Sequence, residues 1–301
     1  MTHVSKTLLR RLAPAAFVAG AALWAAASPA SAVELRLQLQ DRDVARTVSL
    51  GGSCNRCELS GRDLNGAAFH GATFTNATLV GAELRGAELM GSNFSGSDFQ
   101  RADMDGAEMV GANFTGANFT RASMSGVSAP GARFIQARME RADLSGAELT
   151  GANMNGANLN EADFSGAEVN GVTLANVSAR GTDFSDAEID ASNLSNGDFR
   201  SADFTSASLN GSRLTGGRFA GADFEDASLN RADIRGADLS GARNLTQDQV
   251  GRACGDASTR LPRGLTARVC RGMVSVRVAP PAPPAPPVPP RVRNFAIASN
   301  R

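Results

Sequence analysis

Ala82-Glu83-Leu84-Arg85-Gly86 is one of 37 consecutive five-residue units that run from Cys57 to Gly241 without a change of phase. The central residue of nearly every unit is large and apolar, and the residue two positions before it is mostly Ala. An α-helix repeats a face every 3.6 residues and a β-strand every two, so neither keeps a five-residue period on one side. A fixed short period indicates a repeat architecture, here one in which the chain turns a corner every five residues.

These A-[DN]-[LF]-x-G units resemble those of the pentapeptide-repeat family over about 185 of the 301 residues. The resemblance implies an all-β fold, a right-handed quadrilateral β-helix of about nine coils in which four units form one 20-residue coil. It also implies that the central residue and the small residue two positions before it point inward. Two exceptions fit a close-packed core, because the Ala centres Ala129 and Ala179 are preceded by the larger Val127 and Val177.

The register makes two further predictions about the rod. Gly is the most common residue at the last place of a unit, where a corner favours tolerance of positive φ. From Asn176 to Ser206 this place holds mostly Asn, Asp, Ala or Ser, which predicts another turn type there. Rings 20 residues apart should form two buried columns, one of Phe74, Phe94, Phe114 and Phe134 and one of Phe164, Phe184, Phe204 and Phe224.

The chain divides into five segments. Residues 1–32 have the basic start, apolar stretch and Ala30-Ser31-Ala32 site of a cleaved secretory signal peptide. Residues 33–56 alternate apolar and polar side chains at their start, which predicts an N-terminal strand or cap. Residues 57–241 form the β-helix, residues 242–272 a C-terminal helical cap and residues 273–301 a Pro-rich disordered tail.

The helical cap is predicted from Thr246-Gln247-Asp248-Gln249, which has the spacing of a capping box and should start a helix ending near Gly255. The signal peptide predicts an exported protein of the periplasm or the exterior. The alternative is an uncleaved anchor, although the apolar stretch is shorter than the roughly 20 residues that a span needs. After cleavage we expect no stable membrane span.

The composition argues against an enzyme. Once residues 1–32 are removed, the sequence contains one histidine, His70, and no Lys, Tyr or Trp. Nucleophilic schemes that need a buried His, Schiff-base chemistry and His-rich metal sites are therefore excluded. His70 follows a central residue and should point into solvent. We predict no catalytic residue, no cofactor and no metal site.

The four cysteines form two pairs at opposite ends of the repeats, Cys54 with Cys57 and Cys254 with Cys270. Export makes disulfides available. The two ends of the rod should lie about 40 Å apart, so only local pairing is possible within one chain. We predict a Cys254–Cys270 disulfide. Cys54 and Cys57 fit a structural cap better than a redox or metal pair, and the sequence leaves open whether they are bridged.

Charge is distributed unevenly along and around the rod. Residues 57–241 hold 13 Arg and 25 acidic residues, a net −12, whereas residues 242–301 hold 10 Arg and 2 acids, a net +8. Because residues 20 apart stack, the place before the centre forms two acidic columns on neighbouring sides. The first, the Asp column, contains Asp63, Glu83, Asp103, Asp143, Asp163, Asp183, Asp203 and Asp223. The second, the Glu column, contains Glu88, Glu108, Glu148, Glu168 and Glu188.

Together these columns form the acidic face, our candidate interaction surface. One of the other two sides is nearly neutral, and the last mixes 6 acids with 7 Arg. Aligned carboxylates repel one another, so the acidic face favours a counterion or a basic partner. The alternative is that Asp, Asn and Glu merely suit this place in the repeat and stay solvated.

We therefore expect a non-enzymatic solenoid scaffold that presents ladder-like faces to an unknown, basic protein partner. A cation-binding or envelope-structural protein is the alternative from another class. The family resemblance also implies a DNA mimic that binds a type II topoisomerase, but the signal peptide argues against a cytoplasmic target. No nucleic-acid partner is expected, and end-to-end pairing of two rods is left open.

Overall fold

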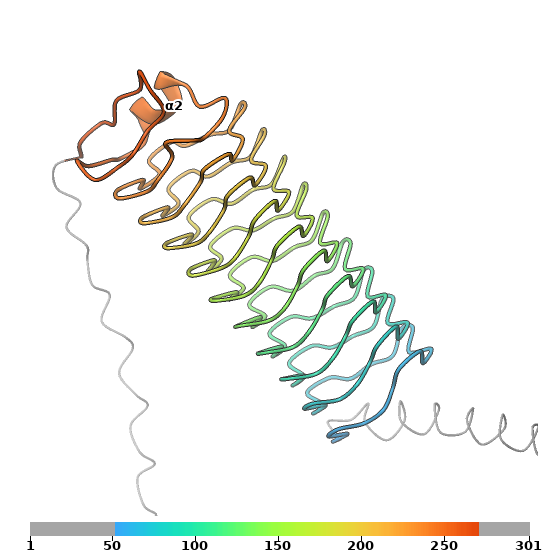
Figure 1. Ribbon diagram of the computed structural model, residues 1–301. Coiled ribbons are helices and arrows are strands. Elements are labelled where there is room, and N and C mark those ends of the chain that lie inside the picture. Colours follow the sequence, from blue (N-terminus) through green and yellow to red (C-terminus); the bar gives the residue numbers. More distant parts are fainter. Residues whose placement is uncertain (1–51, 271–301) are drawn as a thin grey trace, which may run out of the picture.

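The computed structural model describes residues 52–270, which form a rod of stacked coils (Figure 1). The predicted signal peptide, the alternating segment at Val33–Gln40 and the Pro-rich tail lie outside these residues. From Ser53 to Asp223 every fifth residue forms a parallel bridge with the residue 20 positions later, as Asp63 does with Glu83. The Leu64 N–H donates to the Glu83 carbonyl at 2.7 Å, and the Glu83 N–H donates to the Arg62 carbonyl at 2.9 Å.

Each coil contributes four such bridges, one on each side, so the rod is a four-sided β-helix. The bridges around one coil join Asp63 to Glu83, Ala68 to Glu88, Thr73 to Asn93 and Thr78 to Asp98. They are single-residue bridges, because two of every five residues are used to turn the corner. The ladder begins at Ser53, before the predicted start of the repeats at residue 57.

From residue 56 to residue 236 every corner has a positive φ at the last place of its unit. At one corner the Ala67 N–H donates to the Leu64 carbonyl at 3.0 Å, and Gly66 has φ 62°. A positive φ at the third residue is typical of a type II turn. The change of turn type predicted for Asn176–Ser206 is wrong, since Asn176 has φ 60° and Ala191 has φ 54°. The ladder bonds on either side of each corner fix its geometry whichever residue occupies it.

The core consists of the central residues and the small residues before them, which are almost completely buried. The two predicted aromatic columns are confirmed. Ring centroids are 4.7, 5.6 and 5.2 Å apart along the column from Phe74 to Phe134. The column from Phe164 to Phe224 has 5.2 Å at every step. Val127 and Ala129 are both fully buried, as are Val177 and Ala179 to within 2%, which fits the predicted exchange of volume between slots.

The C-terminal end of the rod is closed by α2 (Gln247–Arg252), the helix that the capping box predicts. The structure ends this helix at Arg252 rather than near Gly255. The side-chain amide of Gln249, the N3 residue of the capping box, donates to the carbonyls of Phe224 and Ala227, both at 2.8 Å, so the capping box also covers the last coil. Residues 52–270 contain no helix that is long and apolar enough to cross a membrane.

Candidate functional site

The structure places the two acidic columns on neighbouring sides, with the register that the sequence predicts. The Asp column is bridged without interruption from Asp143 through Asp163 and Asp183 to Asp203. The Glu column is bridged from Glu148 through Glu168 to Glu188. Ser123 and Ser128 interrupt both columns at the same level of the rod and separate off Asp63, Glu83, Asp103, Glu88 and Glu108. The acidic face therefore has its longest continuous part in the middle of the rod.

The Asp column is half-buried there and takes part in the corners. The Asp163 carboxylate accepts the N–H of Ser165 at 2.8 Å, and Asp183 accepts the N–H of Ser185 at the same distance. Such side-chain to backbone bonds two residues on are Asx turns. Asn153, on the neutral side, makes the same bond to Asn155 at 3.0 Å. One oxygen of each Asp is thus occupied by the fold itself.

The Glu column is more available to a partner. From Glu108 to Glu188 its side chains are exposed. Within residues 52–270, Glu108 and Glu168 have no side-chain hydrogen bond or ion pair. Glu148 accepts only the Ser128 hydroxyl at 2.9 Å, and Glu188 accepts the Asn170 amide at 3.3 Å. The continuous part of the Glu column therefore carries negative charge that no cation of the described chain neutralises.

Cations reach the acidic face at its two ends. Arg85 pairs with Asp103 at 2.6 Å, and Arg243 pairs with Asp223 at 3.4 Å. His70 lies within 2.7 Å of Glu88, and both side chains are nearly half exposed, which agrees with the predicted solvated position of the His. None of these three pairs reaches the acids between Asp143 and Asp203.

Two acids on the other sides are buried, and both are neutralised by Arg. Asp198 is 4% exposed and contacts Arg200 at 2.8 Å, Arg180 at 2.7 Å and Arg218 at 3.1 Å. The hydrogen bond from Arg200, with the charges of Arg180 and Arg218, holds the pKa of Asp198 well below its usual range in spite of burial. Burial opposes ionisation of Asp233 too, but the guanidinium of Arg235 outweighs it and lowers the pKa. At both sites the ionic partners among residues 52–270 are Arg, so neither site has the two adjacent carboxylates of a catalytic acid–base pair.

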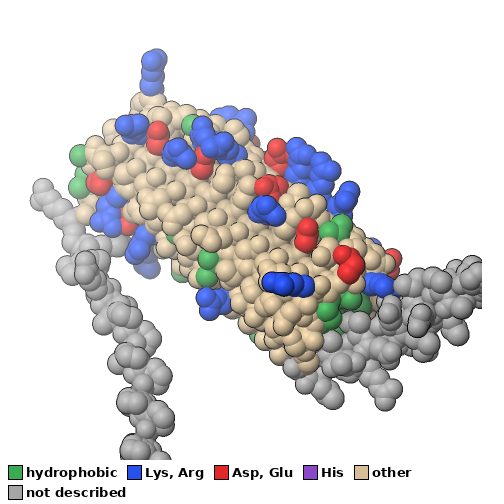
Figure 2. Space-filling model, turned by 60° about the horizontal axis from the view of Figure 1, so that its bottom comes forward, with side chains coloured by type: hydrophobic (Ala, Val, Ile, Leu, Met, Phe, Trp, Pro, Cys, Tyr) green, Lys and Arg blue, Asp and Glu red, His purple; other side chains and the backbone are tan. Residues whose placement is uncertain are grey.

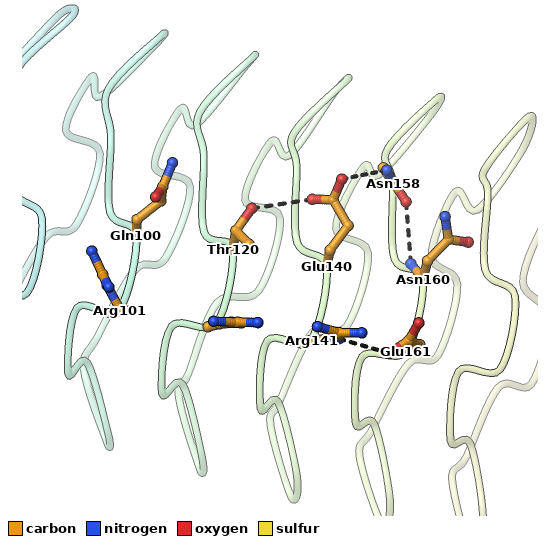
Figure 3. A pocket seen from close by; sticks show the side chains of 9 residues that line it. Gln100, Arg101, Thr120, Glu140, Arg141, Asn158, Asn160 and Glu161 are labelled. Atoms are coloured by element: carbon orange, nitrogen blue, oxygen red, sulfur yellow. Dashed lines mark hydrogen bonds and ion pairs between the residues drawn. The ribbon is translucent and has the colours of Figure 1, made fainter.

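A groove on the side that mixes acids with Arg was not singled out from the sequence. It has a volume of about 410 Å³ and is open to solvent (Figure 3). Its lining includes Arg101, Arg121 and Arg141, which stand at the last place of three consecutive units on this side, with φ of 56°, 60° and 58°. The sequence does carry a signal for this groove, since Arg recurs every 20 residues at the last place of the unit, where Gly is the most common residue. A face with interspersed Arg and acidic side chains is seen in Figure 2.

The profile of the pentapeptide repeats family matches residues 53–91, 87–126, 131–166, 167–205 and 207–243, with eight copies. The chain belongs to the pentapeptide repeat family. HetL from the cyanobacterium Nostoc sp. strain PCC 7120, a pentapeptide repeat protein involved in heterocyst differentiation regulation, has a similar solved structure. It is 29% identical with a TM-score of 0.55, and the match covers 67% of this chain and 87% of HetL.

QnrB1, described as a plasmid-mediated fluoroquinolone resistance protein, is also similar in fold. It is 20% identical with a TM-score of 0.45, and the match covers 67% of this chain and 91% of QnrB1. No curated protein sequence matches the chain. The family profile and the likeness to HetL establish the repeat fold.

In this pentapeptide repeat protein the cysteines lie at the ends of the rod. Cys254 and Cys270 are joined by a disulfide, with Cα atoms 5.4 Å apart, which is the pairing that the sequence predicts. Cys54 and Cys57 are also joined, with Cα atoms 5.5 Å apart, across the first corner. In the part of the chain that the structure describes, no group of three or more His, Cys, Asp or Glu side chains is placed to hold a metal ion.

Proposed function

We propose that this chain is an exported, non-enzymatic scaffold that binds a basic protein through its acidic face. The observation that carries the proposal is the continuous part of the Glu column, Glu148, Glu168 and Glu188, which is exposed and has no cationic partner within residues 52–270. Export is proposed from the signal-peptide pattern of residues 1–32.

The physical reason is electrostatic. Neighbouring coils of a β-helix lie about 4.8 Å apart, so carboxylates in one column are close enough to repel one another. A basic partner relieves this repulsion on binding, and a surface of one sign also speeds the encounter. The buried acids Asp198 and Asp233 are bound by Arg, which supports a scaffold over an enzyme.

The test is a pull-down from envelope and secreted fractions with the chain from Val33 to Arg301 as bait. The variant E148Q/E168Q/E188Q removes three charges and keeps side-chain shape, and D143N/D163N/D183N/D203N keeps an oxygen for the Asx turns. We expect capture by the wild-type chain to weaken with salt, since exposed charges are screened over about 8–10 Å at physiological ionic strength. The Glu variant should lose capture with unchanged thermal unfolding.

The matched control changes the neutral side. Thr occupies the same place as Asn in this column at Thr173, so N113T/N153T/N193T is tolerated by the repeat. Capture that survives the acidic variants but fails in this control would move the binding face to the neutral side. Calcium binding at physiological salt that is lost in the acidic variants would instead favour the cation-binding alternative. Export is tested by sequencing the N-terminus of the fractionated protein, which should begin at Val33.

A further inference from the structure

The side of the rod opposite the Glu column is basic between residues 98 and 220. Successive units pass around four sides, so the side that carries Asp98 and Asn118 lies opposite the side that carries Glu108 and Ser128. Between residues 98 and 220 this opposite side contains more Arg than acids. Its Arg are Arg101, Arg121, Arg138, Arg141, Arg180, Arg200 and Arg218, and its acids are Asp98, Glu140, Glu161 and Asp198.

The groove on this side contains a row of three guanidiniums, Arg101, Arg121 and Arg141, which we call the Arg row. Arg141 pairs with Glu161 at 2.6 Å (Figure 3). The side chains of Arg101 and Arg121 have no hydrogen bond or ion pair within residues 52–270. All three hold a positive φ, which is uncommon for a residue other than Gly, Asn or Asp. The chain thus keeps three long cations in line at corners where Gly would fit more easily.

The acids in the groove do not cancel the Arg row. Glu140 accepts hydrogen bonds from the Thr120 hydroxyl at 3.2 Å and the Asn158 amide at 2.5 Å, so its carboxylate is engaged beside the row rather than with it (Figure 3). Glu161 neutralises Arg141 alone. Arg101 and Arg121, the two guanidiniums of the row without a partner among residues 52–270, therefore set the charge that an incoming ligand meets.

The spacing of the Arg row selects the form of the ligand. Its guanidiniums start from coils about 4.8 Å apart, whereas side chains on one face of an extended peptide repeat every 6.6 Å or so and fall out of step after two coils. Carboxylates on adjacent strands of a parallel ladder stay in step over any length. Glu148, Glu168 and Glu188 of this chain form such a ladder, exposed and without a cationic partner in the described part of the chain.

We propose that the Arg row of one copy binds Glu148, Glu168 and Glu188 of a second copy, with the rods side by side. This inference rests on the proposed function, since it names a partner for the acidic face. The two surfaces differ and lie on opposite sides, so the contact is heterologous, and in a pair each copy keeps one of its two surfaces free. Such contacts extend into open rows of molecules rather than closed dimers.

The test measures size by sedimentation velocity over a range of concentrations of the chain from Val33 to Arg301. The ionic strength is set to about 0.01 M and about 1 M, where charges are screened over about 30 Å and 3 Å. One variant is R101N/R121N/R141N, because Asn already holds a positive φ at Asn76, Asn176 and Asn196. The other is E148Q/E168Q/E188Q. Circular dichroism melts check that both variants stay folded.

We expect wild-type assemblies to grow with concentration at low salt and to dissociate at high salt. Each variant alone should be monomeric. An equimolar mixture of the two should form pairs and stop there, because the Arg variant supplies only the Glu column and the Glu variant supplies only the Arg row. Pair formation in the mixture, with none in either variant, is the result that supports the contact.

A monomeric wild type at low salt, or a mixture that does not pair, overturns the proposal. Association that survives loss of the Arg row but disappears in R291S/R293S assigns the contact to the basic tail and also overturns it. Polyglutamate bound by the Arg row of a monomeric protein identifies a foreign polyanion as the ligand instead. Monomeric rods whose acidic face still captures a basic protein from envelope fractions overturn this inference alone and leave the proposed function standing.

Discussion

Replacing Phe114 with Ala tests whether the rod is held together by its aromatic columns. Phe114 is completely buried, stacked between Phe94 at 5.6 Å and Phe134 at 5.2 Å, and it meets the edge of Phe119 at 5.3 Å. Truncation of a buried Phe to Ala costs about 3–5 kcal/mol, and each lost aromatic pair adds about 0.5–1.5 kcal/mol to what area alone predicts.

The cost should fall near the upper end, about 5 kcal/mol, because the coil has little freedom to collapse around the gap. Above and below Phe114 the spacing is fixed by ladder bonds, such as Phe114 N–H to the Arg133 carbonyl at 2.7 Å and Asn113 N–H to the Ser92 carbonyl at 2.8 Å. A side chain from the next coil cannot enter the cavity without breaking these bonds. F114D, which places a charge there, should break the rod locally.

Hydrogen exchange read by mass spectrometry is the appropriate assay, because a solenoid unfolds by neighbouring coils and need not be two-state. F114A should lose protection most in the coils around residues 94–134, with smaller losses toward both ends, and urea should unfold it at a lower concentration. F114L, which keeps much of the ring's volume, is the matched control and should lose less. A loss below about 1 kcal/mol with protection unchanged would show that the core repacks, and that the ladder does not fix the coil spacing.

Three other predictions concern charge and the C-terminal cap. D198N should cost about 2–3 kcal/mol, below the range for fully buried pairs because the Arg partners are about half exposed. Since folding lowers the pKa of Asp198, its contribution to the free energy of unfolding is present above the unfolded pKa of about 3.9 and is lost as the pH falls further. Below about pH 4, the urea unfolding of D198N should therefore depend less on pH than that of the wild type. Hydrogen bonds lower the pKa of Asp256 to about 2, first that of the Ser258 hydroxyl and then those of the Gly236 and Ser258 N–H groups and the Thr259 hydroxyl. S258A should therefore raise the titration midpoint of Asp256 seen by carbon NMR. Non-reducing peptide mapping should recover Cys254 joined to Cys270, and free thiols in exported protein would contradict the pairing. The variant C254S/C270S should lose about 3 kcal/mol of unfolding free energy, and its C-terminal cap should loosen before the middle of the rod.

The sequence was sufficient for the register of the rod, because a strict period aligns residues 20 apart and determines which side chains stack. Phe74 and Phe94 could be paired in this way, and the capping box at Thr246 could be recognised from spacing alone. Turn type could not be judged from local preference. Ala191 has a poor preference for positive φ, yet the ladder bonds on both sides of the corner impose it.

The Asp198 cluster also escaped the sequence analysis, although its members were counted. Two of its three Arg partners, Arg180 and Arg200, directly follow the central residue of their units, whereas Arg218 directly precedes the central residue of its unit. The three units lie in neighbouring coils. Stacking predicts that these residues are near one another. It does not say that three side chains converge on one carboxylate, because that depends on rotamers and on how far each side chain is buried.

The same distinction decides where function is to be sought on the acidic face. A short Asp side chain reaches back to its own corner, as Asp163 does to Ser165, and the backbone N–H offsets part of the repulsion within the Asp column. A Glu side chain at the equivalent place on the next side extends away from the rod, as Glu168 does. Asn can replace Asp in the corner bond, so the Asp column is explained largely by the fold. The corner does not require Glu, and the charge of the Glu column is therefore the part of this surface that a partner would explain.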